Sequence, residues 1–471
     1  MTASIGFVDL NPRVRKKLQI STKKVKRTPL DFKATRLNYL ILICNQSMQN
    51  IFRAFFGCFV LGFWLIASPA CALDYRLGLD TGASYTRHDN YLDRGSLGLY
   101  DQLPFSVDRS SALFWADPNL SFTLNKGISG YIQADVQWED SDDVVGEEGV
   151  AGKLTNAYLS LSKGGVSADL GLQTVLLGNG LIMADDVPAA LLNLNQGNGY
   201  LQLTLARVLD SSPMAAATLG FRPGYLEELA LFAIGFKDQD DAFANAIPSI
   251  YRLQYAPKSD GGLYWVGASA ELFVAKARFS AVGAYQWGRL RLYNTTGGVS
   301  HDISAYMADL SLEGNLTSWS SLSAFAFVSG GDDTPLRGDV NTFIAIMPYN
   351  PRATIFWDPE FLGRESEDQM LTFNGGFFGG VIAPGLTLDL ESEKGLFAEA
   401  TVATFYAQKE LNDGSRWYGW EIDLQLGYTF AEDYTLYAEA AQFRHGDYYE
   451  SLFNQPLNPA TRLSVGLQVS F

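Results

Sequence analysis

The segment Trp417-Tyr-Gly-Trp-Glu-Ile-Asp-Leu-Gln-Leu-Gly-Tyr-Thr-Phe430 alternates along its length between apolar and polar side chains. Its apolar positions, aromatic at both ends and mainly aliphatic between, are Tyr418, Trp420, Ile422, Leu424, Leu426, Tyr428 and Phe430. Its polar positions are Glu421, Asp423, Gln425 and Thr429. Period two is typical of a β-strand, and an apolar stripe bounded by aromatic residues fits a strand with one side facing lipid. A soluble β-sandwich also alternates, but it has no reason to place aromatic residues at both ends of the stripe.

The same alternation recurs elsewhere and ends the chain. Leu463, Val465, Leu467, Val469 and Phe471 alternate with Arg462, Ser464, Gly466, Gln468 and Ser470. Shorter examples lie at 119–125 and 132–139. After the leader described below, no segment has the ~18 uninterrupted apolar residues that a transmembrane helix needs. The sequence therefore predicts an all-β fold, a transmembrane antiparallel up-and-down β-barrel.

Short and long connections alternate between the predicted strands, as they do in outer-membrane barrels. Tight turns are expected at 163–165, 314–315, 384–385 and 431–433, and long connections near 88–110, 140–151, 177–198, 329–368 and 446–460. The predicted strands are 75–87, 111–125, 129–139, 152–162, 166–176, 199–208, 214–221, 227–237, 249–256, 263–273, 276–291, 302–313, 317–328, 369–383, 385–408, 417–430, 434–445 and 461–471. They make about 18 strands, with 16 as the alternative, and either number leaves a lumen wide enough for water. The count of eighteen places the acidic stretch 238–241 on the inner side of the membrane, an unexpected location.

A leader precedes the predicted barrel. Arg53 is followed by the apolar run 54–66, too short to span a bilayer, and by the small-residue ending 67–72. This order is typical of a secretory signal peptide cleaved after Ala72, with a membrane anchor or lipidation at Cys71 as alternatives. Met48 begins a segment of ordinary signal length. We therefore expect 1–47 to be a non-native upstream extension, 48–72 the signal peptide and 73–471 the outer-membrane β-barrel.

The charge is distributed unevenly along the chain. The formal net charge is −16, yet residues 1–53 hold eleven of the 35 basic residues and two of the 51 acidic ones. The rest of the chain is therefore strongly acidic, which argues against nucleic acid as a partner because phosphates require Lys and Arg. Cys44, Cys58 and Cys71 all precede residue 73, so the predicted barrel has no cysteine for a disulfide or a zinc site.

No catalytic motif occurs in the predicted barrel. Its histidines, His88, His301 and His445, are far apart in sequence and fall at strand ends or in connections. His445 near Asp447 is the best candidate for a catalytic pair, and the acid pairs of the long connections could bind Ca²⁺. A strand-end histidine and solvated acids are the expected interpretations. We therefore expect no enzymatic activity, no cofactor and no metal site.

The residues expected to line the pore are Arg252, Gln254, Lys276, Arg278, Arg289 and Arg291. The first four have the polar parity of their predicted strands, and a bulge at Gly288 would turn the last two inward as well. Clustered lumen charges usually set selectivity. A basic wall patch of Arg252, Lys276 and Arg278 would give a weak preference for anions. Pairing of these residues with inward acids is the alternative.

Two segments resemble those of a known family. Residues 327–343, Phe-Val-Ser-Gly-Gly-Asp-Asp-Thr-Pro-Leu-Arg-Gly-Asp-Val-Asn-Thr-Phe, resemble the Ser-Gly-Asp-Asp…Phe segment of alginate-export-type outer-membrane barrels, and residues 169–180 resemble their glycine-rich strand-to-loop segment. The resemblance implies a monomeric 18-stranded pore for an anionic polysaccharide, with an arginine-rich lumen. This chain differs in its acidic balance and in its modest number of inward basic residues. The long-loop site candidates are Asp332, Asp333, Arg337 and Asp339.

The expected function is passage or export of a hydrophilic solute, such as an oligo- or polysaccharide, through the outer membrane of a Gram-negative bacterium. An outer-membrane enzyme would require a histidine-centred site assembled from separate loops. A structural or adhesive barrel would require the connection 329–368 to fold inward and seal the lumen. The expected partners of the monomer are outer-membrane lipid and lipopolysaccharide, the solute, and the barrel-assembly machinery, because Phe471 resembles the common C-terminal assembly signal.

Overall fold

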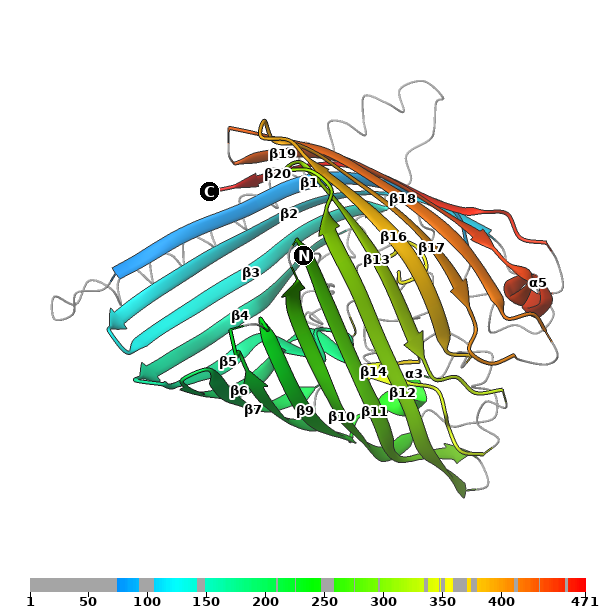
Figure 1. Cartoon of the computed structure of the whole chain (residues 1–471), viewed down its shortest axis with the longest axis horizontal. Helices are drawn as coiled ribbons and strands as arrows, with labels where there is room; N and C mark the ends of the chain where they lie inside the picture. The colour runs from blue at the N-terminus through cyan, green and yellow to red at the C-terminus, as the bar shows by residue number, and fades with distance from the viewer. Residues whose placement is uncertain are drawn as a thin grey trace, which may run out of the picture.

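In the computed structural model the chain forms a closed barrel of eighteen antiparallel strands (Figure 1). The structure describes residues 74–92, 106–141, 149–208, 211–224, 226–246, 258–274, 276–294, 297–333, 338–346, 348, 352–358, 371–373, 379–410, 414–431, 433–453 and 456–471. The barrel strands are β1 (Asp74–Leu92), β2 (Ser106–Asn125), β3 (Ile128–Ser141), β4 (Gly149–Lys163), β5 (Val166–Leu177), β6 (Met183–Gln196), β7 (Gly199–Val208), β8 (Ser212–Phe221), β9 (Glu228–Asp238), β10 (Ser259–Val274), β11 (Ala277–Asn294), β12 (Gly297–Asn315), β13 (Ser320–Ser329), β16 (Val381–Glu391), β17 (Leu396–Tyr406), β18 (Trp417–Phe430), β19 (Tyr434–His445) and β20 (Ala460–Ser470). The strand pair β14 (Ile344–Ile346) and β15 (Leu371–Phe373) and the helices α3 (Ala242–Ala246) and α5 (Asp447–Phe453) lie outside this sheet. No helix among these residues is long and apolar enough to cross a membrane.

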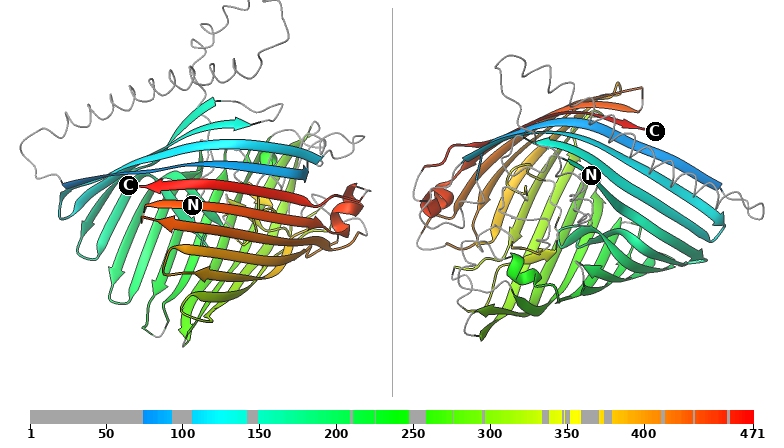
Figure 2. Two further views of the ribbon diagram at one scale, coloured as in Figure 1. Left: turned by 90° about the horizontal axis from the view of Figure 1, so that it is seen from above. Right: turned by 180° about the vertical axis from the view of Figure 1, so that it is seen from behind.

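The barrel closes because its first strand pairs with its last. β1 pairs with β2 on one edge and with β20 on the other, where Asp80 lies opposite Ser470. Figure 2 shows the blue first strand beside the red last strand. β13 pairs with β16 across the connection 330–380, and each of the other neighbouring pairs follows the order of the chain.

The two ends of the barrel differ in their connections. At one end, the strands are joined by turns of two to six residues, whereas the other end carries the connections 93–105, 239–258, 330–380 and 446–459. In outer-membrane barrels, the short turns face the periplasm and the long loops face outward. We call the two ends the turn end and the loop end.

The outer surface of the barrel carries an apolar band. Ile422, Leu424 and Leu426 on β18 are 43–48 % exposed, whereas Glu421 has no exposed area and points inward. On β20, Leu463, Val465 and Leu467 are exposed in the same way. A water-soluble protein would bury such a continuous apolar surface, so the band faces lipid. The lipid-facing stripes predicted from the sequence are confirmed on these strands.

The stripe of β18 differs from the prediction at its loop end. Tyr418 is fully buried, and its hydroxyl donates to the carbonyl of Gly380 at 3.0 Å. The register between β17 and β18 shifts beside Phe405, and Gly419 has a φ of 145°, which suits a residue without Cβ. This bulge explains why Tyr418 turns inward instead of facing lipid.

The predicted number of strands is correct, but two errors compensate each other. Residues 177–198, expected as a long connection, contain β6, where Asp185, Asp186 and Pro188 obscure the strand pattern. Conversely, β9 pairs directly with β10, so no strand lies between them in the sheet, and the predicted strand 249–256 lies outside the described residues. The prediction left out β6, so it gave the strands from β7 to β9 the opposite direction. With β6 included, β9 ends at the loop end, and Asp238 therefore lies where acidic residues are expected.

The predicted strands 369–383 and 385–408 have the wrong limits. The tight turn lies at 392–395, between β16 and β17, instead of at 384–385. Gly385 lies opposite Phe325 in the sheet, and a Cβ on this glycine would be 2.2 Å from the Phe325 ring. The glycine therefore allows a cross-strand aromatic ring to pack closely and does not mark a turn.

Deleting Phe471 should lower the amount of folded protein recovered in outer-membrane fractions. Its N–H donates to the Leu79 carbonyl at 3.0 Å and its carbonyl accepts from the Leu79 N–H at 3.2 Å, so it completes the seam between β1 and β20. Its ring is 68 % exposed at the turn end, near Tyr434, as in an interfacial aromatic girdle. Losing two hydrogen bonds should cost about 1–3 kcal/mol. The measurement is the heat-modifiable band on gels; Phe471→Tyr is the control, and an unchanged yield after deletion would contradict the prediction.

Candidate functional site

The connection between β13 and β16 enters the barrel and lies against its inner wall. We call its described residues from Gly338 to Asp358 the inner loop. The Gln286 side chain of β11 donates to the Ile344 carbonyl and accepts from the Ile344 N–H, both at 2.9 Å. Val340 bonds to the backbone of β12 on either side of Ile303. Val340 and the residues from Phe343 to Ile346 are fully buried, which explains why this part of the loop leaves the aqueous loop end.

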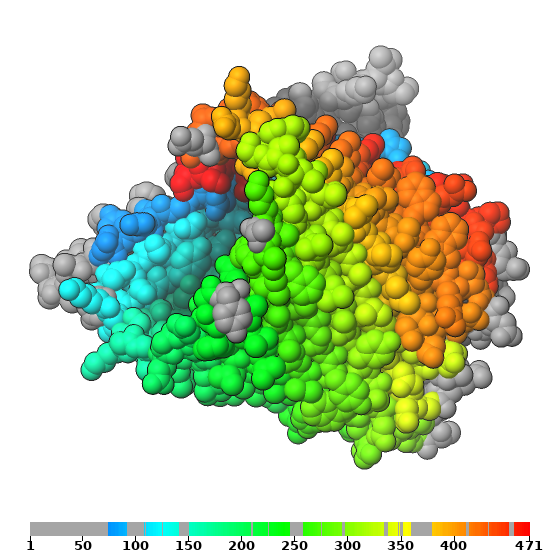
Figure 3. All heavy atoms as spheres, in the orientation of Figure 1, coloured from blue at the N-terminus to red at the C-terminus, as the bar shows by residue number. Residues whose placement is uncertain are grey.

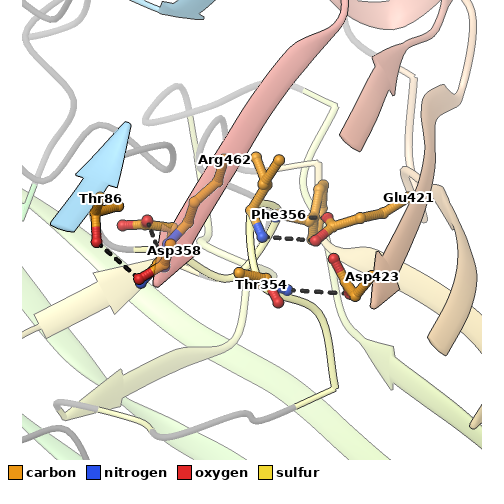
Figure 4. A network of polar contacts seen from close by, with 9 residues as sticks. Thr86, Thr354, Phe356, Asp358, Glu421, Asp423 and Arg462 are labelled. Carbon is orange, nitrogen blue, oxygen red and sulfur yellow. Dashed lines mark hydrogen bonds and ion pairs between the residues drawn. The ribbon is translucent and has the colours of Figure 1, made fainter. Parts of the chain in front are cut away.

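The second part of the inner loop is held by carboxylates on β18 (Figure 4). The N–H groups of Ile355 and Phe356 donate to the two carboxylate oxygens of Glu421 at 2.6 and 2.8 Å. The Thr354 N–H donates to Asp423 at 3.3 Å. Backbone N–H groups of a loop have no neighbouring strand to accept their hydrogen bonds, and leaving them buried and unpaired is unfavourable. Carboxylates meet this need because they are strong hydrogen-bond acceptors.

Aromatic packing adds to these bonds. The Phe356 ring stacks on Phe405 of β17 with centroids 3.9 Å apart, and it lies 5.6 Å from Tyr418 and 5.8 Å from Phe443. Trp357 meets Phe327 of β13 edge-on at 5.2 Å. Tyr418, turned inward by the bulge at Gly419, is therefore part of the surface that receives the loop.

Two ion pairs connect the same part of the loop to the wall. Arg352 bonds to Asp309 of β12 at 2.6 Å, and burial lowers the pKa of the Arg352 guanidinium while Asp309 opposes this shift. Asp358 lies 3.6 Å from Arg462 of β20. Together these contacts carry the inner loop from the β11–β12 wall to the β18–β20 wall, so it narrows the lumen.

The rest of the described lumen wall is predominantly acidic. Strand parity and register direct a set of carboxylates inward from β16–β19 and β1–β3, which we call the acidic arc: Asp389, Glu399, Glu439, Asp80, Asp117 and Asp135. Asp389 lies opposite Glu399, and Glu439 lies one strand further along, beyond Gln425. The inward basic residues on the described strands include Arg76, Lys153, Arg278 and Arg462. In the space-filling view the molecule is hollowed beside β1–β4, at the turn end (Figure 3).

The described residues include two members of the predicted basic wall patch, and one of them, Arg278, lies on the wall. Arg278 faces the lumen near the turn end, where its Nε bonds to Glu271. Lys276 lies in the turn between β10 and β11 and not on the wall. Arg252 and Gln254 lie outside the described residues.

Arg289 and Arg291 point to the outside of the barrel, so their assignment to the pore is wrong. The register of β11 with both neighbours is continuous through Gly288, without the expected bulge. The two arginines share the parity of lipid-facing Trp287, whereas Leu290 between them is fully buried inside. Arg289 bonds to Asp302 at 2.7 Å, and Arg291 lies 3.7 Å from Asp260.

The other predicted candidates lie at the loop end. Asp332 is buried, Asp333 and Asp339 are exposed, and Arg337 lies outside the described residues. His301 and His445 have Nδ1 within 2.7 and 2.9 Å of the carbonyls of Gly338 and Asn458. Among the described residues, no group of three or more His, Cys, Asp or Glu could hold a metal ion.

The sequence did not show which inward residues receive the inner loop. Glu421 and Asp423 have the correct inward parity, but their role as acceptors depends on a segment 65–69 residues away. Two adjacent inward carboxylates on one strand, without a basic residue between them, are the available sequence signal. Such a pair needs donors, and here loop N–H groups supply them.

The closed eighteen-stranded barrel with its apolar outer band defines an outer-membrane β-barrel of a Gram-negative bacterium. No family model matches the sequence, and no curated protein matches it. Solved structures do match its fold. OccK2 (OpdF) of Pseudomonas aeruginosa has a TM-score of 0.53 at 11 % identity, with 84 % of this chain and 98 % of that chain covered. OccK5 (OpdH) of the same species and OccAB2 of Acinetobacter baumannii each have a TM-score of 0.52 at 13 % identity with the same coverage.

Proposed function

We propose that the protein is a monomeric channel through which hydrophilic solutes cross the outer membrane. The observation that carries the proposal is the inner loop, which is attached to two walls of a wide barrel and so forms a constriction inside it. An eighteen-stranded barrel is wide enough for an aqueous lumen, and an inward loop reduces its width to the dimensions of a solute. The polar inner wall supplies hydrogen-bonding groups along the path.

We further propose that the channel prefers cationic or neutral solutes. The acidic arc faces the lumen, while Arg278 is paired with Glu271 and Arg462 with Asp358. Rings of carboxylates favour cations, and charges in a narrow lumen act through focused, weakly screened fields. This preference is opposite to the one expected from a basic wall patch.

In planar bilayers with a salt gradient, the reversal potential should have the sign of cation preference. Asp389→Asn, Glu399→Gln and Glu439→Gln combined should move it toward zero, because half of the acidic arc is neutralised. Asp302→Asn is the matched control, since that carboxylate faces the outside of the barrel. A wild-type pore that prefers anions would overturn the proposed selectivity.

The resemblance to alginate-export-type barrels leads to a second candidate solute, an anionic oligo- or polysaccharide. The same bilayer assay tests it, because alginate oligomers that bind in the lumen would interrupt the ion current. We also propose that the chain is not an enzyme, since Nδ1 of His301 and of His445 faces a backbone carbonyl in place of a nucleophile or a carboxylate.

A further inference from the structure

We propose that the outer surface of β7–β11, at the loop end, binds phosphate groups of an outer-leaflet glycolipid. Three cations, Arg207 on β7, Lys237 on β9 and Arg289 on β11, form what we call the basic row. This proposal is independent of what passes through the lumen.

Strand parity places the basic row on the lipid side. Arg207 lies two residues after Leu205, which is 64 % exposed, and Arg289 lies two residues after exposed Trp287. Lys237 alternates with Phe236 and Asp238, both buried inside. Each cation therefore follows directly on the apolar band of its strand, toward the loop end.

The cations are regularly spaced across the sheet. Lys237 and Arg289 are both register partners of Gly262 on β10, one on each side. Arg207 is the register partner of Pro213 on β8, the strand that separates it from β9. Each cation is thus two strands from the next, roughly 10 Å. Pro213 and Gly262 are the residues between them.

Gly262 lies between two cations in the register, and the Tyr264 ring lies beside it. A Cβ at this position would lie 3.4 Å from the Phe236 carbonyl and 3.7 Å from the Tyr264 hydroxyl, so the tyrosine side chain packs against this glycine. The hydroxyl is a further hydrogen-bond donor on this part of the surface. A phosphate beside it could contact Lys237, Arg289 and this hydroxyl together.

The aromatic residues next to the basic row fix its depth in the membrane. Tyr264 and Trp287 stack with centroids 5.8 Å apart, and Tyr285 lies 6.1 Å from Trp287. Tyr and Trp gather at the level of lipid headgroups. The basic row lies on the loop-end side of these rings and therefore in the headgroup layer of the outer leaflet, which makes a membrane lipid the committed ligand.

Among the described residues, the neighbouring acids form an ion pair with one cation of the basic row, Arg289. Asp302 accepts from Nε of Arg289, and both side chains are more than half exposed, so this pair contributes little and can exchange partners. The terminal guanidinium nitrogens of Arg289 make no hydrogen bond within the described residues, and Lys237 has no ion-pair partner there. Four acids lie near the basic row and Arg291: Asp186, Asp240, Asp260 and Asp302. Asp186 accepts from Thr174, and Asp240 accepts from Ser211 and Ser212, so among the described residues no ion pair joins either of them to the basic row.

Binding of diphosphorylated lipid A to the purified full-length barrel in detergent micelles tests the proposal. The variant Arg207→Gln, Lys237→Gln and Arg289→Gln should bind it at least about tenfold more weakly, because three cations that attract the lipid phosphates are lost. The same lipid with both phosphates removed should bind both proteins equally. Arg278→Gln, which removes a cation inside the lumen, should bind like the wild type.

Further measurements separate loss of binding from loss of folding, and a lipid site from a site for free anions. Heat modifiability shows whether each variant is folded, and the folded variant Arg207→Lys, Arg289→Lys should retain the affinity. Equal binding of diphosphorylated lipid to the Gln variant and the wild type would overturn the proposal. So would displacement of the lipid by equimolar inorganic phosphate, which would indicate a site for free anions.

Discussion

Replacing Glu421 and Asp423 by alanine should raise the single-channel conductance and increase switching between current levels. These two carboxylates accept three N–H groups of the inner loop at 2.6–3.3 Å. Hydrogen bonds to a charged group contribute about 1.5–3 kcal/mol each, whereas each aromatic contact of Phe356 adds about 0.5–1.5 kcal/mol. Without its polar anchors the loop should leave the wall for part of the time and open the constriction.

Gln425→Ala is the matched control for this experiment. Gln425 lies on the inner face of the same strand, but its amide bonds to Glu439 and not to the loop. Glu421→Gln should have an intermediate effect, because the neutral amide offers one acceptor oxygen in place of two. If the double variant folds and its conductance equals that of the wild type, the loop is not held as we describe.

Leu424→Arg should strongly reduce the recovery of folded barrel. Leu424 is 43 % exposed within the apolar band, with Ala400 and Ala440 beside it on the neighbouring strands. A charge near the bilayer midplane costs about 2–4 kcal/mol on a barrel's lipid face. Urea unfolding from lipid vesicles measures this loss, and heat modifiability reports the folded fraction.

Gln425→Arg, one residue further, should be tolerated. Its register partners are Glu399 and Glu439, so the new guanidinium would lie between two carboxylates in the lumen. The comparison is sensitive because adjacent residues of a strand face opposite sides. Equal losses from both substitutions would mean that the two faces of β18 have been assigned incorrectly.

Alternation predicted the barrel well because it is a local property of each strand. Whether a residue has an odd or even position along its strand shows whether it faces lipid or the lumen, and this rule holds for most of β18 and for β20. It fails where a bulge changes parity, as at Gly419, or where a bulge is assumed and does not occur, as at Gly288. It also fails for β6, whose proline and acids resemble a loop.

The site was less predictable because it depends on contacts between distant segments. Polar parity assigned Glu421 and Asp423 to the lumen, but it could not show that a connection would enter the barrel and meet them. The pairing of Arg278 with Glu271 is a local contact across a tight turn, and it agrees with the alternative expected from inward parity. The selectivity of the channel depends on which charges remain without such partners, so an estimate from basic residues alone gives the opposite preference to the one that we propose from the described wall.

The attachment of the inner loop to β11–β12 and to β18–β20 has a consequence for the order of folding. These walls face each other once the intervening strands have joined the sheet and β1 has met β20. Bringing the loop to both walls costs conformational entropy, and this cost falls once the surrounding strands are ordered. Docking of the loop is therefore expected as a late step of biogenesis, and an assembly intermediate should have a wider bore than the mature protein.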